Sequence, residues 1–142
     1  MSTIHIHARD IVHHDAVGTF ARQVAMLAQG VGHEAQLWAE HAENFADTPV
    51  QSRDVFWDAV RPGDIVFFNH SIHDPILERI AALPNPKLLY FHNVTPPELI
   101  DSEDERTIEN CRLGLEQRRF AARFDGLLAN STDSATCLLD GL

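Results

Sequence analysis

Five short stretches of the chain have the hydrophobic pattern of β-strands. Ile65–Phe68 is a continuous apolar run, which is typical of a strand covered on both faces. In Thr3–His7 the apolar residues alternate with polar ones, and this pattern also predicts a strand. The predicted strands are Thr3–His7, Glu34–Ala39, Ile65–Phe68, Lys87–His92 and Gly126–Ala129, the last of them buried.

The segments between these strands show helical periodicity. From Val17 onward the apolar residues recur every three or four positions, and Gly30 and Gly32 supply a stop signal. The predicted buried face of this helix contains Val17, Phe20, Ala21, Val24, Leu27, Ala28 and Val31. Further helices are predicted at Asp54–Val60, Ile76–Leu83, Thr107–Phe124 and Thr132–Leu139, with Glu40–Ser52 as a loop.

This alternation of strands and helices predicts the fold class. Short apolar strands that alternate with amphipathic helices favour an α/β fold with helices on both faces of a parallel sheet. With right-handed crossovers, such a sheet is doubly wound and Rossmann-like. A length of 142 residues suits a single domain with a sizeable core, so we expect one domain over residues 1–142.

Charge and composition narrow the possible partners and compartment. The formal net charge is −10, which argues against a nucleic-acid or anionic-membrane surface as the main partner. The amino terminus lacks the pattern of a signal peptide, and no apolar run approaches the roughly 20 residues that a membrane span needs. We therefore expect a cytoplasmic protein. The two cysteines, Cys111 and Cys137, are expected to be reduced thiols.

Three predicted strands end in polar residues that are candidates for binding. These ends are Asn69-His70-Ser71, His92-Asn93 and Asn130-Ser131. Because ligands of open α/β sheets bind outside the carboxyl ends of the strands, the three ends suggest a binding edge. Asn and Ser are also common turn formers and N-caps, and this simpler explanation is strongest for Asn130 and Ser131. For His92 a functional role is favoured, because turn chemistry does not require an imidazole there.

Two neighbouring motifs add weaker signals. Pro96 and Pro97 follow Thr95 and favour a rigid exit from the strand, which would fix the direction of His92. Asp15-Ala16-Val17-Gly18 lies between the first strand and the first helix, where such folds hold phosphate. A single glycine is not a dinucleotide-binding fingerprint, and a tight turn is the simpler interpretation of Gly18.

The histidines raise a metal hypothesis. The chain has 9 histidines, and the best candidate ligand groups are His13-His14-Asp15 and His70-x-x-His73-Asp74. Neither group matches a metalloenzyme spacing such as H-E-x-x-H, so we do not expect a metal site. No G-x-S-x-G elbow is present, and nucleophilic hydrolysis has no direct support.

The order of these motifs resembles a known family. Asp15-Ala16-Val17-Gly18, Tyr90-Phe91-His92-Asn93-Val94-Thr95-Pro96-Pro97 and Leu128-Ala129-Asn130-Ser131 together resemble the N-terminal half of bacterial family 4 glycosyltransferases. The string around His92 is the most specific part. The resemblance implies a GT-B architecture, in which two Rossmann-like domains face each other. It also implies metal-independent, retaining transfer of a sugar from a nucleotide-sugar to an acceptor hydroxyl, in polysaccharide or glycoconjugate synthesis.

The resemblance also implies roles for individual residues. Gly18 would offer its backbone N–H near the donor phosphate, and His92 would be the catalytic-site residue facing the transferred sugar or the acceptor. Asp15, Asn93 and Ser131 would line the acceptor side. No cofactor is implied beyond the nucleotide-sugar donor, and peripheral attachment to the inner face of the membrane is compatible with the family.

The chain departs from the family because it lacks the second domain, which supplies the glutamate motif and the basic residues for the donor phosphates. We therefore expect a fragment that is inactive alone, or a chain that pairs with a separate partner or with itself. Two other functions remain open at this point. One is a non-catalytic α/β module that binds a small ligand or a protein, and the other is a histidine-dependent metal hydrolase.

Overall fold

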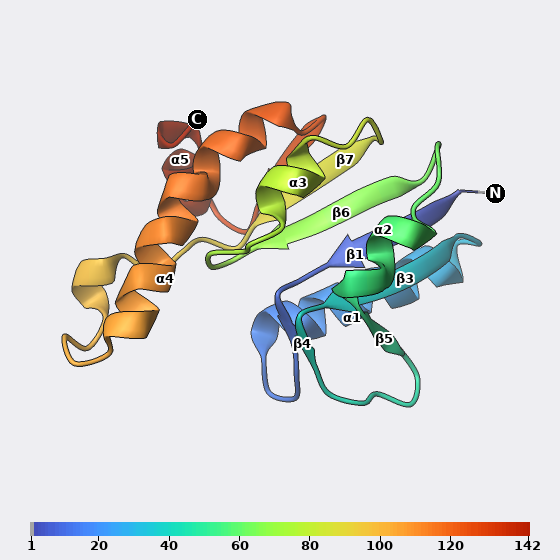
Figure 1. Cartoon of the computed structure of the whole chain (residues 1–142), viewed down its shortest axis with the longest axis horizontal. Coiled ribbons are helices and arrows are strands. Elements are labelled where there is room, and N and C mark those ends of the chain that lie inside the picture. Colours follow the sequence, from blue (N-terminus) through green and yellow to red (C-terminus); the bar gives the residue numbers. More distant parts are fainter. Residues whose placement is uncertain (1) are drawn as a thin grey trace. The chain divides into compact units, whose positions relative to one another are not determined.

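The main sheet has the strand order of a Rossmann-like fold. The computed structural model describes residues 2–142 and contains a parallel sheet of 6 strands in the order β5-β3-β1-β6-β7-β8 (Figure 1). The strands are β1 (Thr3–His7), β3 (Glu34–Ala39), β5 (Val50–Ser52), β6 (Ile65–His70), β7 (Lys87–Phe91) and β8 (Gly126–Ala129). The first strand therefore lies in the middle, and the order reverses between β1 and β6, as in doubly wound sheets. The predicted fold class is confirmed.

Among residues 2–142, four α-helices lie between these strands along the chain and a fifth follows the last strand. They are α1 (Ala16–Gly30), α2 (Phe56–Ala59), α3 (Leu77–Ala81), α4 (Glu105–Glu116) and α5 (Thr132–Asp140). The 3₁₀ segment Arg53–Val55 precedes α2, and Pro97–Leu99 precedes α4. A third 3₁₀ segment, Gln117–Arg123, continues α4. The sequence predicted the helices correctly, but it did not separate the 3₁₀ turns from them.

The prediction of Glu40–Ser52 as a loop was wrong. This segment contains β4 (His41–Ala42), which pairs with β2 (Asp10–Ile11), and β5, which pairs with β3. These strands are only two or three residues long and mostly polar, so they carry no hydrophobic periodicity that could reveal them.

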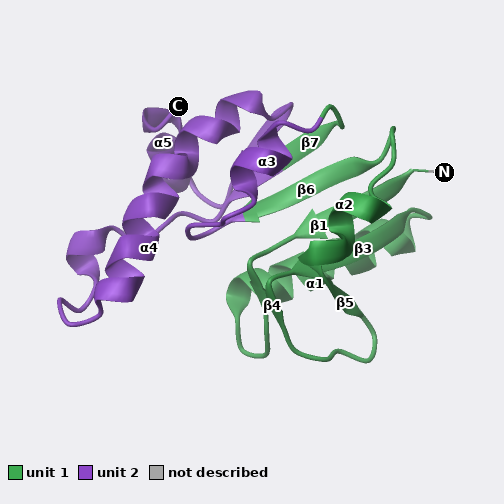
Figure 2. Ribbon diagram, viewed as in Figure 1, with its two compact units in different colours: residues 1–69, 84–88 green, residues 70–83, 89–142 purple. Residues whose placement is uncertain are grey.

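The chain forms two compact units. Unit 1 comprises the chain up to Asn69 together with Pro84–Leu88, and unit 2 comprises His70–Leu83 and Leu89–Leu142 (Figure 2). The expectation of a single domain over residues 1–142 stays a prediction.

In unit 1, small residues bring α1 close to the sheet. The residues of α1 that are buried are Gly18, Ala21, Ala25 and Ala28, and they face Ile6, Leu37 and Ala39 of β1 and β3. Leu27 and Val31, which were predicted on the buried face, are 70% and 67% exposed. That part of the prediction was wrong because alanines fill the contact with the sheet, and the larger apolar residues at the edge of the stripe are left outside.

The opposite face of β1 and β3 is aromatic and unusually rich in histidine. His5, His7 and Trp38 share this face because side chains alternate along a strand. Phe56, at the start of α2, covers them, with its ring centroid 5.3 Å from that of His5 and 4.4 Å from that of His7. Helices therefore cover both faces of the sheet within unit 1.

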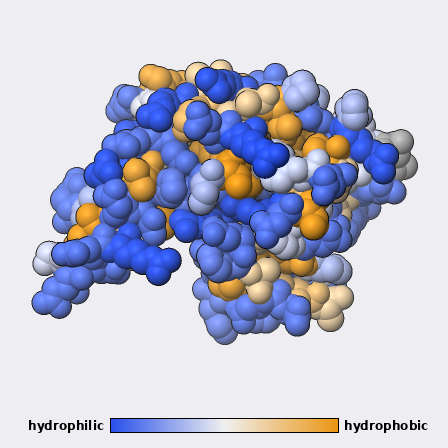
Figure 3. Space-filling model, viewed as in Figure 1, coloured by the Kyte–Doolittle hydropathy of each residue, from blue (hydrophilic) through white to orange (hydrophobic). Residues whose placement is uncertain are grey.

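The prediction of β8 as a buried strand was wrong. Leu127 and Leu128 are 36% and 43% exposed, although they point to opposite faces of the strand. β8 is the last strand in the sheet order, so no strand of the described residues lies beyond it. The face drawn in Figure 3 is mostly hydrophilic, with hydrophobic residues in small scattered patches. None of the helices in residues 2–142 has the length and apolar character needed to cross a bilayer.

Candidate functional site

His92 lies at the carboxyl end of β7 in unit 2, where the sequence placed a binding edge. A pocket of about 320 Å³ opens there, lined by His92, Asn93, Val94, Thr95, Pro96 and Leu99. The backbone N–H of His92 donates to the carbonyl of His70 at 2.9 Å, which ties the ends of β7 and β6 together. His92 and Asn93, two of the predicted site residues, therefore line one pocket.

The environment of His92 keeps its imidazole neutral. Its ring packs against that of Tyr90, with the centroids 4.6 Å apart, and the side chain is half-buried. Burial disfavours the charged form and lowers the pKa of His92 to about 4. At neutral pH the ring can therefore donate one hydrogen bond and accept another.

The residues after His92 form a hydrogen-bonded turn. Asn93 has a φ of 72°, a left-handed conformation that Asn tolerates better than most residues, and its Oδ1 accepts from the N–H of Val94 at 2.8 Å. The carbonyls of Pro96 and Pro97 accept from the N–H groups three residues later, those of Leu99 and Ile100, and close the 3₁₀ turn Pro97–Leu99. Both prolines lie in the turn that follows the strand, and their predicted stiffening of the exit from the strand stays a prediction.

His70, at the end of β6, is a buried neighbour of this site. It is fully buried, and neither of its ring nitrogens has a hydrogen-bond partner within the described part of the chain. Burial and the charge of Arg118 lower the pKa of His70 to about 4. A fully buried imidazole without partners is a cost to stability, and it is stable in this place only in its neutral form.

Hydrogen bonds hold the loop after His70 against α4 and the 3₁₀ segment that continues it. The side chain of Gln117 accepts from the N–H of Asp74 at 2.9 Å and donates to its carbonyl at 2.7 Å. The N–H of His73 donates to the carbonyl of Asn110 at 3.2 Å. Gly114 allows this approach, because a Cβ there would lie 2.8 Å from the backbone nitrogen of His73. These contacts fix the carboxyl end of β6.

Ser131 acts as a helix cap. Its Oγ accepts from the N–H of Ser134 at 3.1 Å, as an N-cap of α5 does, and Ser131 itself is exposed. Asn130 donates to the carbonyl of His92 at 3.4 Å, which connects the end of β8 to the end of β7. The capping explanation for Ser131 is therefore confirmed, and its predicted contact with an acceptor remains a prediction.

Asp15 and Gly18 begin α1 in unit 1. The Oδ2 of Asp15 accepts from the N–H of Gly18 at 2.7 Å, so Asp15 is the N-cap of this helix. Gly18 is required by packing, because a Cβ would lie 3.0 Å from the Cα of Ile11 and 2.9 Å from Asp15 Oδ2. The N–H that was predicted to face a phosphate is thus already bonded to a carboxylate.

A buried polar network in unit 1 was not found by sequence reasoning. Trp38 Nε1 donates to His5 Nδ1 at 3.0 Å, and His5 Nε2 lies 2.8 Å from Asp64 Oδ2. Since Nδ1 accepts, Nε2 must carry the proton and donate to Asp64. Asp64 also accepts from the N–H groups of Thr3 and Arg61, both at 3.0 Å. Burial opposes the ionised carboxylate, but these donors outweigh it, His5 first among them, and lower the pKa of Asp64.

Replacement of Asp64 by Asn is expected to destabilise unit 1 by about 2–4 kcal/mol. An amide at this position would place an N–H group against one of the three donors, of which the His5 ring is buried, and leave that donor unpaired. Urea unfolding followed by tryptophan fluorescence measures the loss, because Trp38 and Trp57 both belong to unit 1. Asp58→Asn, at an exposed position of α2, is the matched control and should leave the unfolding midpoint unchanged.

Metal ligation and similarity to known proteins complete the description of the site. Among residues 2–142, no three His, Cys, Asp or Glu side chains come together in a group that could hold a metal ion. Comparison with protein-family models, with curated proteins and with solved structures gave no match. Functional assignment therefore depends on the geometry of the strand ends and on the sequence resemblance.

Proposed function

We propose that this chain is the acceptor-binding half of a glycosyltransferase that moves a sugar from a nucleotide-sugar to an acceptor hydroxyl with retention. The observation that carries this proposal is the neutral imidazole of His92 in a pocket at the carboxyl end of β7. This is the edge at which open α/β sheets bind ligands. The motif around His92 that resembles family 4 glycosyltransferases forms the wall of the same pocket.

The lining of the pocket suits an uncharged polyhydroxyl ligand. None of the six residues that line it in the described chain carries a formal charge at neutral pH. A sugar hydroxyl both donates and accepts hydrogen bonds, and so does neutral His92. The hydroxyl of Thr95 and the side chain of Asn93 offer further partners. In the proposed reaction His92 hydrogen-bonds a hydroxyl of the transferred sugar or of the acceptor.

The donor phosphates would be stabilised by the start of α1. The first N–H to bond within the helix is that of Thr19, which donates to the carbonyl of Asp15. The N–H groups of Ala16 and Val17 precede it and point out of the helix end, where anions are favoured. Because the leaving diphosphate gains charge during transfer, such donors would stabilise it without a metal ion. In this proposal Gly18 allows the tight turn before α1, and its N–H does not donate to the phosphate.

The proposal includes a second domain for the donor and a cytoplasmic location. A facing domain would supply the basic residues for the nucleotide-sugar, either in the same polypeptide or in a partner chain. Asp15, Asn93 and Ser131 remain proposed contacts on the acceptor side.

Replacement of His92 by Ala is expected to lower turnover by about 100-fold in the complete protein or assembly that performs the transfer. The variant loses one hydrogen bond that is aimed at the reacting sugar, and single donors of this kind contribute about 100-fold to 1000-fold. Transfer from a panel of nucleotide-sugars to glycan acceptors measures turnover.

The matched control is His41→Ala, at an exposed position of β4, which should retain wild-type turnover. Circular dichroism should show that both variants remain folded. Near wild-type turnover of the His92→Ala variant would eliminate His92 as a catalytic-site residue. Saturable sugar binding by an assembly without transfer would favour a binding module instead.

A further inference from the structure

Half of β3 lacks a neighbour on one side of the sheet. All five residues of β1 pair with β3, from Glu34 to Trp38. β5 pairs only with the carboxyl-terminal half, from Leu37 to Ala39. Within the described residues, the outer edge of Glu34–Gln36 is therefore left without a strand.

Hydrogen bonds from Arg22 keep the segment before β5 away from this edge. The segment before β5 would continue beside Glu34–Gln36 if it stayed extended, but Arg22 of α1 fixes it elsewhere. Arg22 donates to the Oγ1 of Thr48 at 2.8 Å and to Asp47 Oδ1 at 3.0 Å, and Thr48 is buried. Pro49 follows and has no N–H to give to a sheet. Specific contacts within unit 1 therefore leave the edge of β3 at Glu34–Gln36 open.

The backbone groups at this edge are ready to pair. The carbonyl of Trp38 faces β1, because it accepts from the N–H of Ala8. Backbone groups alternate along a strand, so those of Ala35 and Leu37 face away from β1. Leu37 is paired with β5 there, whereas no strand of the described residues lies beside Ala35 on that side. The side-chain amide of Gln36 donates to the carbonyl of Leu37 at 3.0 Å, next to the start of β5.

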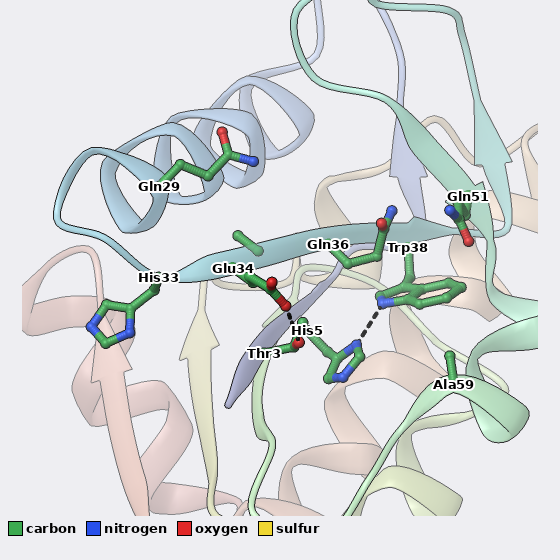
Figure 4. A pocket seen from close by; sticks show the side chains of 10 residues that line it. Thr3, His5, Gln29, His33, Glu34, Gln36, Trp38, Gln51 and Ala59 are labelled. Carbon is green, nitrogen blue, oxygen red and sulfur yellow. Dashed lines mark hydrogen bonds between the residues drawn. The ribbon is translucent and has the colours of Figure 1, made fainter. Parts of the chain in front are cut away.

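Two cavities flank the open edge, one on each face of β3. The larger, of about 570 Å³, lies on the side of Thr3, His5 and Trp38, with Gln51 at its β5 end (Figure 4). The smaller, of about 230 Å³, lies on the α1 side and is lined by Ala25, Gln29, Ala35, Gln36, Leu37, Thr48 and Pro49. Gln29, Ala35 and Gln36 line both cavities. Successive side chains of an extended peptide point to opposite faces, as these two cavities require.

We propose that the edge of β3 at Glu34–Gln36 binds an extended peptide segment of a partner protein as an added strand. The peptide backbone would run beside Glu34–Gln36 and pair with the N–H and carbonyl of Ala35. Strand addition of this kind takes its affinity from main-chain hydrogen bonds and its specificity from pockets for alternate side chains. This surface is separate from the proposed sugar-transfer site.

The cavity linings determine which side chains the peptide carries. Glu34 lines the larger cavity, and no Lys or Arg is among the described residues that line either cavity. A basic side chain therefore fits the larger cavity. The smaller cavity has the methyl groups of Ala25 and Ala35 and suits a small aliphatic side chain. Because the chain itself has a net charge of −10, a basic segment is favoured over a second copy of this chain.

A designed peptide tests this inference with the intact chain. The probe is acetyl-Thr-Val-Arg-Val-Thr-Val-amide, which alternates valine with threonine and arginine. Titration followed by amide NMR should shift the backbone signals of Ala35 and Leu37 and the side-chain amide of Gln36. N-methylation of the central valine should weaken binding about tenfold, since it removes one main-chain hydrogen bond and its geometry. Equal binding by the methylated peptide, or no shift at millimolar peptide, would overturn the proposal.

A charge exchange tests the assignment of the larger cavity. Glu34→Lys should weaken binding of the arginine probe about tenfold and strengthen binding of the same peptide with glutamate in place of arginine. Glu78→Lys, at an exposed position of α3, makes the same change of charge away from the edge and should leave both affinities unchanged. If the two variants behave alike, the effect is that of net charge, and the cavity is not the site of the basic side chain.

Discussion

Acidification from pH 7 to about pH 4.5 should destabilise unit 2 by roughly 2.5 kcal/mol through His70 alone. The pKa of His70 is about 4 in the folded protein, against an ordinary value of 6.5. A group whose folded pKa is lowered in this way binds its proton more readily in the unfolded chain. The contribution of His70 is therefore fully present above about pH 6.5, and it is lost as the pH falls from there toward 4. The lowered pKa of His92 acts in the same direction and window.

The variant His70→Leu separates this effect from general acid denaturation. Leucine fills a similar volume and does not titrate, so the variant should lose about 2.5 kcal/mol less stability than the wild type over the same pH range. Circular dichroism in urea at each pH gives the free energy of unfolding. An identical pH dependence in the two proteins would show that His70 is not the titrating group.

His7 of unit 1 is also fully buried, and burial lowers its pKa well below the ordinary value, so His7→Leu should flatten the acid response of tryptophan fluorescence.

Replacement of Gly114 by Ala should destabilise unit 2 by about 2–3 kcal/mol, at the upper end of the usual range for overpacking. The added Cβ would lie 2.8 Å from the nitrogen of His73 and 3.0 Å from the carbonyl carbon of Ile72. Both are backbone atoms, so the clash cannot be relieved by a change of side-chain rotamer. The loop must move away from α4, and its hydrogen bond to Asn110 weakens with the movement.

The control for this variant is Gly30→Ala in α1, where an added Cβ meets no atom within 4 Å. Since alanine is a better helix former than glycine, this variant should be neutral or more stable by up to about 1 kcal/mol. Thermal unfolding of the two variants beside the wild type gives the comparison. If Gly114→Ala were as stable as Gly30→Ala, the close approach of α4 to the Ile72–His73 backbone would be refuted.

The strands that can be predicted from the sequence are those with apolar runs. Ile65–Phe68 and Thr3–His7 are readily recognised because their side chains occupy the core, and burial imposes a pattern on the sequence. β5 could not be predicted, since Gln51 and Ser52 are exposed at a sheet edge and any polar residue serves there. For the same reason the extent of the uncovered edge of β3 became visible only in the strand register.

The candidate site was partly predictable for a related reason. His92 and Asn93 are neighbours in the sequence, so their common place at a strand end follows from local pattern alone. The contact of His5 with Asp64 joins residues 59 positions apart, and that of Trp38 with His5 joins residues 33 positions apart. No local pattern records which polar side chains meet across adjacent strands. His70 and His7 were visible as histidines, but their lack of hydrogen-bond partners depends on the packing around them.

The division of the chain into units has a consequence for its synthesis. Unit 1 includes Pro84–Leu88, which follow a segment of unit 2 in the sequence. A nascent chain therefore cannot complete unit 1 when Asn69 leaves the ribosome, because a strand segment that belongs to it has not yet been translated. Folding of unit 1 has to wait until Leu88 has emerged, by which time α3 of unit 2 is already outside. Neither unit is a contiguous stretch of the sequence, so the two units are interleaved along the chain as it is made.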